Sequence, residues 1–244
     1  MATSPIDLHW SLTTPEADGD TAKTYTPSQV AALTGNKYFE ITDSYLRFTA
    51  PVNGFHTARS MKTRSEFREY QPGTNKEQNW TGSGGTHSMG ASLVVNSVPN
   101  KVDKKEGAVF IGQIHVDDGA SPMFKFLYQN EGTAANTGKV VASFRADPDP
   151  KTNPANSDLF TGIAKGARIQ YYVKVSSTGK LTAYVQVGDV RKDFAGDLAL
   201  WLQANAQTLF YFKAGVYNDA LPTSTVEDSN QSEALFYKLT TTHA

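Results

Sequence analysis

The 244-residue chain contains no cysteine. This absence excludes thiol catalysis, cysteine-ligated zinc, iron–sulfur clusters and a disulfide framework. The sequence also has no apolar run close to the roughly 20 residues that a membrane-spanning helix needs, so we expect no membrane contact. Charge of neither sign is in excess, because 23 basic residues stand against 24 acidic ones. A globally basic nucleic-acid-binding protein is therefore not expected.

Short segments of alternating apolar and polar residues, rich in β-branched and aromatic side chains, recur along most of the chain. Gly, Asn, Asp and Pro cluster between them, as is typical of turns. The predicted strands are Phe39–Phe48, Thr63–Tyr70, His87–Val95, Val109–Val116, Phe124–Tyr128, Val140–Arg145, Arg168–Ser176, Leu181–Val187, Phe210–Tyr217 and Ala234–Leu239. Helical patterns are limited to Pro27–Leu33 and Asp197–Asn205. The chain is therefore predicted to be one all-β domain, residues 1–244, built of two antiparallel sheets.

Three of these strands gather polar side chains on one face. Because side chains alternate along a strand, each face can be read from the sequence: Arg64, Glu66 and Arg68 in the first strand, Gln113 and His115 in the second, and Tyr211, Lys213 and Tyr217 in the third. One face of an antiparallel sheet is often simply solvated, and that alternative stays open. Guanidinium, imidazole, amide and phenol groups side by side instead favour the binding of sugars and carboxylates.

The same strands carry the sequences RSEFRE at 64–69, QIH at 113–115 and YFKAGVYN at 211–218. They closely resemble, in the same order, the three signature strands of polysaccharide lyase family 7, the alginate lyases. The segments Phe48–Gly54 and His87–Val95 are also similar to that family. Asp219 departs from the family, which usually has Gln after Tyr-x-Asn. The resemblance implies an antiparallel β-sandwich of the jelly-roll, concanavalin-like kind with one or two short helices.

The resemblance also implies a function. Members of this family cleave uronic-acid polymers by β-elimination, so we expect an alginate lyase that cuts a (1→4)-linked polysaccharide and releases unsaturated oligouronates, by attack within the polymer. The expected partner is alginate or a related anionic polyuronate, with no cofactor and no metal, and the protein is expected to be a secreted monomer.

Three other functions are weighed against this one. A glucuronan lyase of the same fold and a non-catalytic carbohydrate-binding module or lectin stay open. A sandwich-fold glycoside hydrolase is not expected, because that chemistry needs two carboxylates flanking the bond and the Glu-x-Asp-x-Glu strand pattern is absent.

Residue roles follow from the resemblance alone. Catalysis would fall to Arg64, Gln113, His115 and Tyr217. The first three would neutralise the carboxylate beside C5, and Tyr217 would give a proton to the departing O4. His115 would remove the C5 proton of guluronate, and Tyr217 that of mannuronate. The residues expected to bind substrate are Arg68, Glu66, Lys213, Tyr211 and Asn218.

Some residues keep a second interpretation. Glu66, between two arginines, could equally form a structural ion pair. His87 is expected to be a core or edge histidine, because it shares a face with Met89 and Leu93. The proline-containing stretch Asp147–Asp158 is either a lid or an ordinary surface loop.

Overall fold

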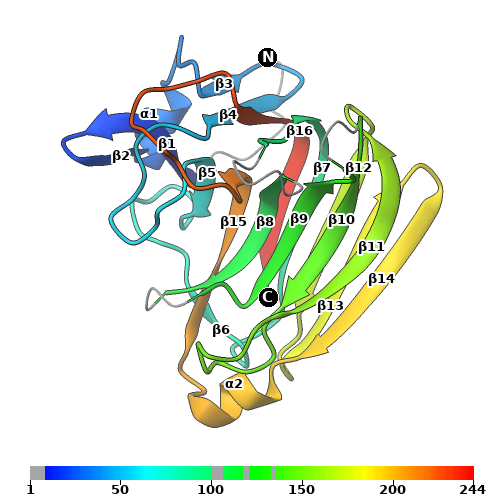
Figure 1. Ribbon diagram of the computed structural model, residues 1–244. Helices are drawn as coiled ribbons and strands as arrows, with labels where there is room; N and C mark the ends of the chain where they lie inside the picture. The colour runs from blue at the N-terminus through cyan, green and yellow to red at the C-terminus, as the bar shows by residue number, and fades with distance from the viewer. Residues whose placement is uncertain (1–8, 101–106, 118–120, 133–135) are drawn as a thin grey trace.

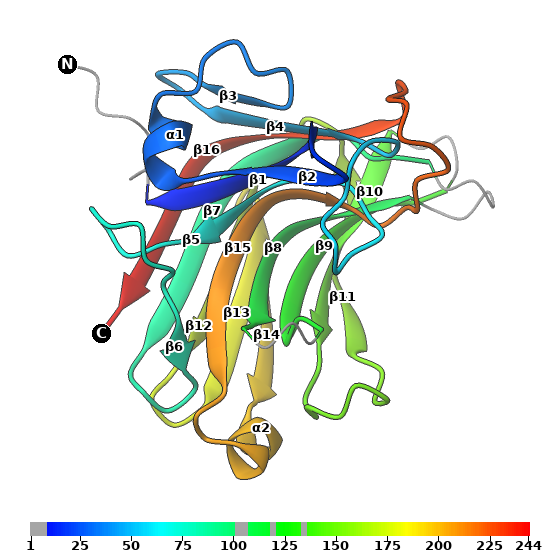
Figure 2. The same cartoon turned by 90° about the vertical axis from the view of Figure 1, so that its left-hand side faces the viewer.

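The computed structural model describes residues 9–100, 107–117, 121–132 and 136–244. Within them, two curved antiparallel sheets pack face to face as a sandwich (Figure 1). The first sheet contains, in spatial order, β11 (Ala155–Ala164), β10 (Thr137–Phe144), β9 (Phe124–Asn130), β8 (Ala108–Val116), β15 (Leu209–Asn218), β5 (Arg64–Glu69), β1 (Trp10–Asp18) and β2 (Thr21–Tyr25), with β6 (Trp80–Thr81) paired to β15. Figure 2 shows β5, β15, β8 and β9 side by side in the front layer.

The second sheet lies behind the first in that view. It contains, in spatial order, β14 (Val190–Asp197), β13 (Lys180–Val187), β12 (Ile169–Val175), β7 (His87–Ser97), β16 (Gln231–His243), β4 (Leu46–Pro51) and β3 (Phe39–Ile41). Two short helices, α1 (Pro27–Ala31) and α2 (Ala199–Ala204), lie outside the sheets. No helix in the described ranges is long and apolar enough to cross a bilayer.

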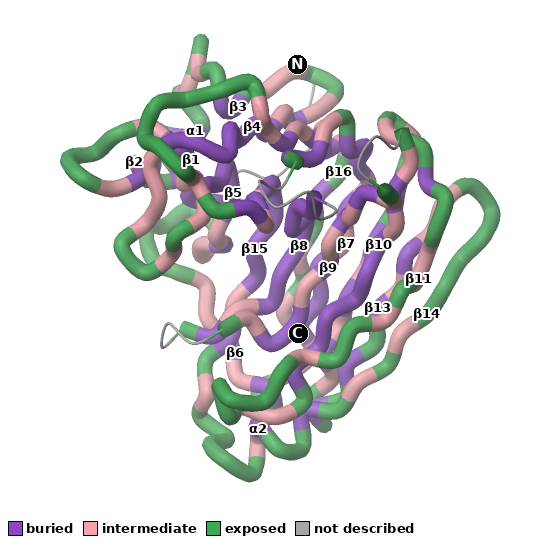
Figure 3. The backbone as a smooth tube through the Cα atoms, viewed as in Figure 1, coloured by how far each residue is buried: buried purple, intermediate pink, exposed green. Residues whose placement is uncertain are grey.

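The inward-facing side chains of the two sheets form the core. Phe67 of β5 and Phe48 of β4 meet edge to face with ring centroids 4.8 Å apart, and both are fully buried. Each such aromatic ring contributes about 1.5–3 kcal/mol by leaving water. Figure 3 shows buried residues concentrated in the central strands and exposed ones in the outer loops. The first sheet, which carries the polar face, is thus supported on its inner side by a closely packed core.

Tyr171 of β12 crosses the core to the first sheet. Its hydroxyl donates to the backbone carbonyl of Ile111 at 3.0 Å, which satisfies a buried polar group. A Cβ at position 112 would lie 2.7 Å from this hydroxyl, so any residue larger than glycine there would have to displace Tyr171. Burial raises the pKa of Tyr171 well above its ordinary value, which keeps the phenol protonated as a donor.

Most of the predicted central strands are confirmed, with shifted ends, and both predicted helices are present in shorter form. The single strand predicted over Phe39–Phe48 is wrong. Two strands, β3 and β4, occupy it, because Thr42 forms a turn in which its Oγ1 accepts from the backbone N–H groups of Ser44 and Tyr45.

The irregular stretch predicted over Asp147–Asp158 is shorter than expected, because β11 begins at Ala155 and pairs with β10. The strands β1, β2, β6, β11 and β14 were not predicted. Most of them lie at or near sheet edges, where one face is solvated and the apolar alternation is weak; β14, for example, has no buried residue.

Candidate active site

The polar faces of β5, β15 and β8 meet at one pocket in the middle of the first sheet. Its volume is about 340 Å³. The strand residues that line it are Arg64, Gln113, His115, Tyr211, Lys213 and Tyr217, and the loop residues are Thr57, Arg59, Ser60, Asp117, Ser121 and Pro122. In the strand register Tyr217 lies opposite Arg64, Lys213 lies opposite Gln113, and Tyr211 lies opposite His115. The structure therefore brings together all four residues expected to be catalytic.

Gly215 lets β15 and β5 approach closely beside this pocket. Its φ of +139° is a conformation that other residues rarely adopt, and a Cβ there would lie 2.5 Å from the carbonyl oxygen of Ser65. The register of β15 against β8 also shifts between Ala214 and Tyr217. Such irregularities are common next to functional sites, and Tyr217 lies at the end of this one.

Glu66 holds the cationic side chains of the pocket together. It is 2% exposed and forms ion pairs with Lys213 and, at 3.1 Å, with Arg64. The side-chain amide of Gln113 donates to its other oxygen. Burial alone would raise the pKa of Glu66, but the charges of Lys213 and Arg64 outweigh it and leave the pKa below its usual range. Glu66 does not line the pocket. Of its two interpretations, the structure supports the ion pair rather than substrate contact.

Arg64 and Gln113 each keep an unused polar atom beside the pocket. Within the described part of the chain, Nε of Arg64 and Oε1 of Gln113 are buried and have no hydrogen-bond partner. The guanidinium carbon of Arg64 lies over the ring of Tyr217, 4.0 Å from its centroid. Buried polar atoms left without partners in a native structure call for an explanation, and a ligand is one. Arg64 offers a donor to a carboxylate, and Gln113 offers an acceptor.

His115 is arranged as a neutral base. Its Nδ1 lies 2.8 Å from the carbonyl oxygen of Val116. A carbonyl can only accept, so Nδ1 carries the proton and Nε2 carries the lone pair. Burial and the charge of Lys213 lower the pKa of His115 to about 4, so the ring is uncharged near neutral pH. Nε2 has no hydrogen-bond partner among the residues that the structure describes, which leaves it available to a ligand in the pocket.

Tyr217 has a partner that the strand patterns did not reveal. Its hydroxyl lies 2.8 Å from Oγ of Ser60, in the loop before β5. Ser60 also accepts from the backbone N–H of Lys62, which fixes its position. No periodicity marks a loop residue, so this contact carried no signal in the sequence.

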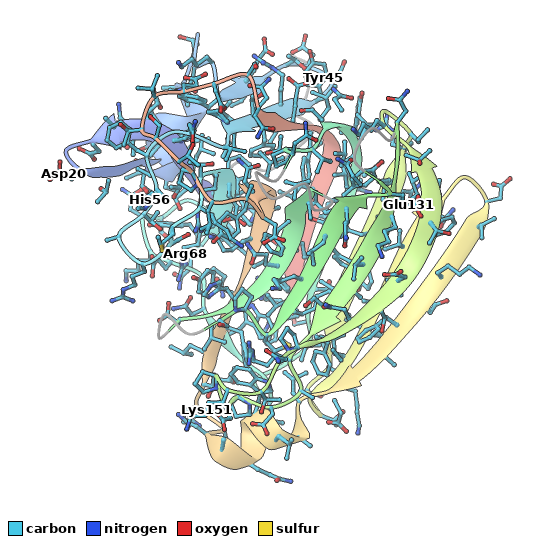
Figure 4. The ribbon with its side chains drawn as sticks, viewed as in Figure 1. Asp20, Tyr45, His56, Arg68, Glu131 and Lys151 are labelled. Carbon is cyan, nitrogen blue, oxygen red and sulfur yellow. The ribbon has the colours of Figure 1, made fainter. Side chains whose placement is uncertain are left out.

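Tyr211 and Arg68 form the other end of the site. Burial raises the pKa of Tyr211 to about 12, so the phenol stays protonated. Its ring stacks on His115, and the guanidinium of Arg68 lies 4.0 Å from its centroid. Arg68 is paired with Asp117 at 3.0 Å and Glu77 at 2.9 Å and does not line the pocket. Arg68, which is labelled in Figure 4, therefore packs on Tyr211, and its contact with substrate stays a prediction.

The prediction that Asn218 binds substrate is wrong. Its side chain is fully buried and donates to the carbonyl oxygens of Ala50 at 3.0 Å and Pro51 at 3.1 Å, and to Oγ1 of Thr63. The physical reason is alternation: Tyr217 faces the pocket, so its neighbour faces the core. Asn218 ties β15 to β4.

The histidines outside the pocket have structural contacts. His87 is buried, stacks on Trp80 and hydrogen-bonds His243, as expected of a core or edge histidine. His243 also hydrogen-bonds the buried Glu69 at 2.9 Å. Across the described ranges no group of three or more His, Cys, Asp or Glu side chains is arranged to hold a metal ion.

Comparisons with known proteins agree with this geometry. The sequence model of the alginate lyase family matches residues 6–243. Alginate lyase PA1167 from Pseudomonas aeruginosa is 31% identical, with 98% of this chain and 100% of that one covered and a TM-score of 0.82. Alginate lyase A1-II′, a member of polysaccharide lyase family 7, is 27% identical over 99% of both chains with a TM-score of 0.76.

A complex of A1-II′ with the substrate GGMG is 25% identical, covering 99% of this chain and 97% of that one, with a TM-score of 0.74. A search of curated proteins finds no match. The matched length and the agreement in fold decide the family: this chain belongs to the alginate lyases of polysaccharide lyase family 7.

Proposed function

We propose that this protein is an alginate lyase that cleaves (1→4)-linked uronates by β-elimination, with His115 and Tyr217 as the proton-transfer groups. One observation carries the proposal: a neutral His115, with its Nε2 lone pair unused, shares a pocket with the guanidinium of Arg64 and the hydroxyl of Tyr217. A base, a carboxylate-binding cation and a proton donor are the three groups that β-elimination next to a carboxylate needs.

The reaction begins at C5 of the uronate. Its proton is a weak acid, because the neighbouring carboxylate is already negative. Arg64 and Lys213 lie where they would compensate that charge and the further charge that develops as the proton leaves. Glu66 does not cancel them, since one carboxylate faces two cations. Among the described charged residues of the pocket and Glu66 beneath it, cations therefore outnumber acids, which favours an anionic substrate.

Proton transfer then breaks the glycosidic link. The base takes the C5 proton, the C5–H electron pair forms the C4=C5 double bond, and the C4–O4 bond breaks. Tyr217 gives its proton to O4, so one product carries the unsaturated uronate and the other a new reducing end. In guluronate, where C5–H and O4 lie on opposite sides, His115 is the proposed base. In mannuronate, where they lie on the same side, Tyr217 serves both steps.

Ultraviolet absorbance tests the proposal directly. The purified protein is incubated separately with polyguluronate, polymannuronate and glucuronan. Elimination makes a conjugated unsaturated uronate that hydrolysis cannot make, so a rise in absorbance with alginate blocks is the expected result. A rise with glucuronan alone would make the protein a glucuronan lyase, and flat traces with folded protein on all three would overturn the proposal.

The binding-module alternative is separated by variants. His115→Ala and Tyr217→Phe are expected to retain polymer binding and lose turnover, whereas a lectin needs neither group for proton transfer. Binding by the unaltered protein without any turnover would favour the module.

We further infer attack within the polymer, by a secreted monomer. A binding face that crosses the first sheet and a substrate too large to enter a cell support these inferences. A fall in viscosity that outpaces the release of unsaturated ends, sedimentation at one protomer mass, and activity in the culture medium of the source are the measurements that test them.

A further inference from the structure

Lys125 lies one strand away from the proposed catalytic residues. It belongs to β9, and in the strand register it is directly opposite Gln113 of β8. Its neighbours Phe124 and Phe126 are fully buried in the core, so alternation directs Lys125 to the same side as Gln113. The side chain is half-buried. The next strand of the sheet thus presents a cation beside the pocket.

The ammonium group of Lys125 rests on an aromatic ring. Its Nζ lies 4.7 Å from the ring centroid of Phe110, and that ring packs against Tyr217 at 5.2 Å. Lys125 makes no hydrogen bond or ion pair with any of the described residues. The interaction of a cation with a ring is weaker than an ion pair. The ammonium of Lys125 can therefore still bind an anion next to Tyr217.

The described charged groups around Lys125 do not neutralise its positive charge. Burial lowers the pKa of Lys125, and the charge of Asp219, which acts the other way, is opposed by those of Lys62 and Arg145. Asp219 is ion-paired with Lys62, and Arg145 donates to the backbone carbonyl of Asp149. Among the described residues whose charge acts on Lys125, cations therefore outnumber acids, and Asp219 already pairs with Lys62.

We propose that Lys125 binds the carboxylate of the uronate next to the one held by Arg64, on the leaving-group side of the scissile bond. The inference rests on the proposed function, since Tyr217 marks the side on which O4 departs. Neighbouring strands lie about 4.8 Å apart, close to the length of one pyranose ring in an extended chain. A polymer that crosses the sheet from β8 to β9 therefore advances by about one uronate, and its next carboxylate meets the next cation.

Lys125→Met tests the charge while keeping the methylene packing on Phe110. Loss of a charge-assisted hydrogen bond is expected to raise KM for polymeric alginate by about tenfold or more. The turnover number should change little, because a contact made equally in ground state and transition state affects KM alone. Added salt should also weaken the variant less than the unaltered enzyme, since one screened contact is gone.

Lys174→Met is the matched control. Lys174 is a half-buried lysine of β12 in the other sheet, so its replacement removes the same net charge away from the pocket. Lys125→Arg keeps the charge and is expected to keep KM within about threefold. An unchanged KM in Lys125→Met, or an equal rise in Lys174→Met or Lys125→Arg, would overturn the inference.

Binding measured without turnover separates this inference from the proposed function. Calorimetry with oligouronates compares Tyr217→Phe with the double variant Tyr217→Phe/Lys125→Met. Weaker binding of oligouronates by the double variant than by Tyr217→Phe supports the inference, and equal binding by the two variants refutes it. Failure of the unaltered enzyme to produce unsaturated uronate from any polymer would instead refute the proposed function.

Discussion

Replacing Glu66 by Gln tests how the pocket is held together. Glu66 forms ion pairs with Arg64 and Lys213 inside the protein, so the amide leaves two buried cations without an anion. Removing one partner of a buried ion pair costs about 3–5 kcal/mol of unfolding free energy. In a chain of this length 1 kcal/mol corresponds to about 2–4 °C, so Tm is expected to fall by about 6–20 °C.

Urea unfolding and scanning calorimetry measure the loss. The control is Glu77→Gln, which removes a half-exposed acid from Arg68 and is expected to cost less than about 1 kcal/mol. The double variant Glu66→Gln/Lys213→Met removes one cation together with the acid and should be more stable than Glu66→Gln alone. A loss in Glu66→Gln as small as in Glu77→Gln would refute the view that this carboxylate organises the pocket.

Three further predictions concern single groups. Tyr217→Phe should lower kcat by about 10²–10⁴-fold, as expected for loss of a general acid, with Tm nearly unchanged; an active variant would assign the proton to another group. Asn218→Ala should cost about 1–3 kcal/mol in urea unfolding, because it removes the buried hydrogen bonds that the side-chain amide donates to the carbonyls of Ala50 and Pro51. A raised KM with unchanged stability would favour substrate contact instead. The pH profile of kcat/KM should fall as the pH drops toward 4, where His115 gains a proton, and above about 8, where Lys213 loses one; an acidic limb near 6.5 would contradict the buried environment of His115.

The central strands could be predicted because they are buried against the second sheet. In β15 every second residue from Phe210 to Val216 packs in the core, and alternation of apolar side chains in the sequence reflects this directly. Strands at or near the sheet edges lack this clear alternation of apolar and polar residues. β14 has no buried residue, and β1, one strand in from the edge, contains Pro15 where a register shift interrupts its pairing with β2. Their presence depends on a partner strand distant in sequence, which no local pattern encodes.

Alternation also placed the candidate site on one face of the sheet, but it could not predict how deeply each side chain of that face is buried. Glu66 and Arg68 share the face of Arg64. In the structure, however, Glu66 is buried in ion pairs with two cations, and Arg68 packs against the ring of Tyr211. Depth depends on ion pairs between strands and on loops such as the one that carries Ser60. Asn218 is different: alternation from Tyr217 already directs it to the core, and only the resemblance favoured substrate contact.

The cations that hold the substrate also govern the base. Burial, Lys213 and Arg64 together lower the pKa of His115, which keeps the ring neutral but makes Nε2 a weak base in the unliganded pocket. A bound uronate carboxylate would offset the charges of Lys213 and Arg64 and so raise the pKa of His115 at the moment when a stronger base is needed. The acidic limb of kcat, which reports the complex, should therefore lie at higher pH than that of kcat/KM, which reports the free enzyme. Coincident limbs would mean that the substrate charge is not felt at His115, and the carboxylate would then have to bind elsewhere than beside Arg64 and Lys213.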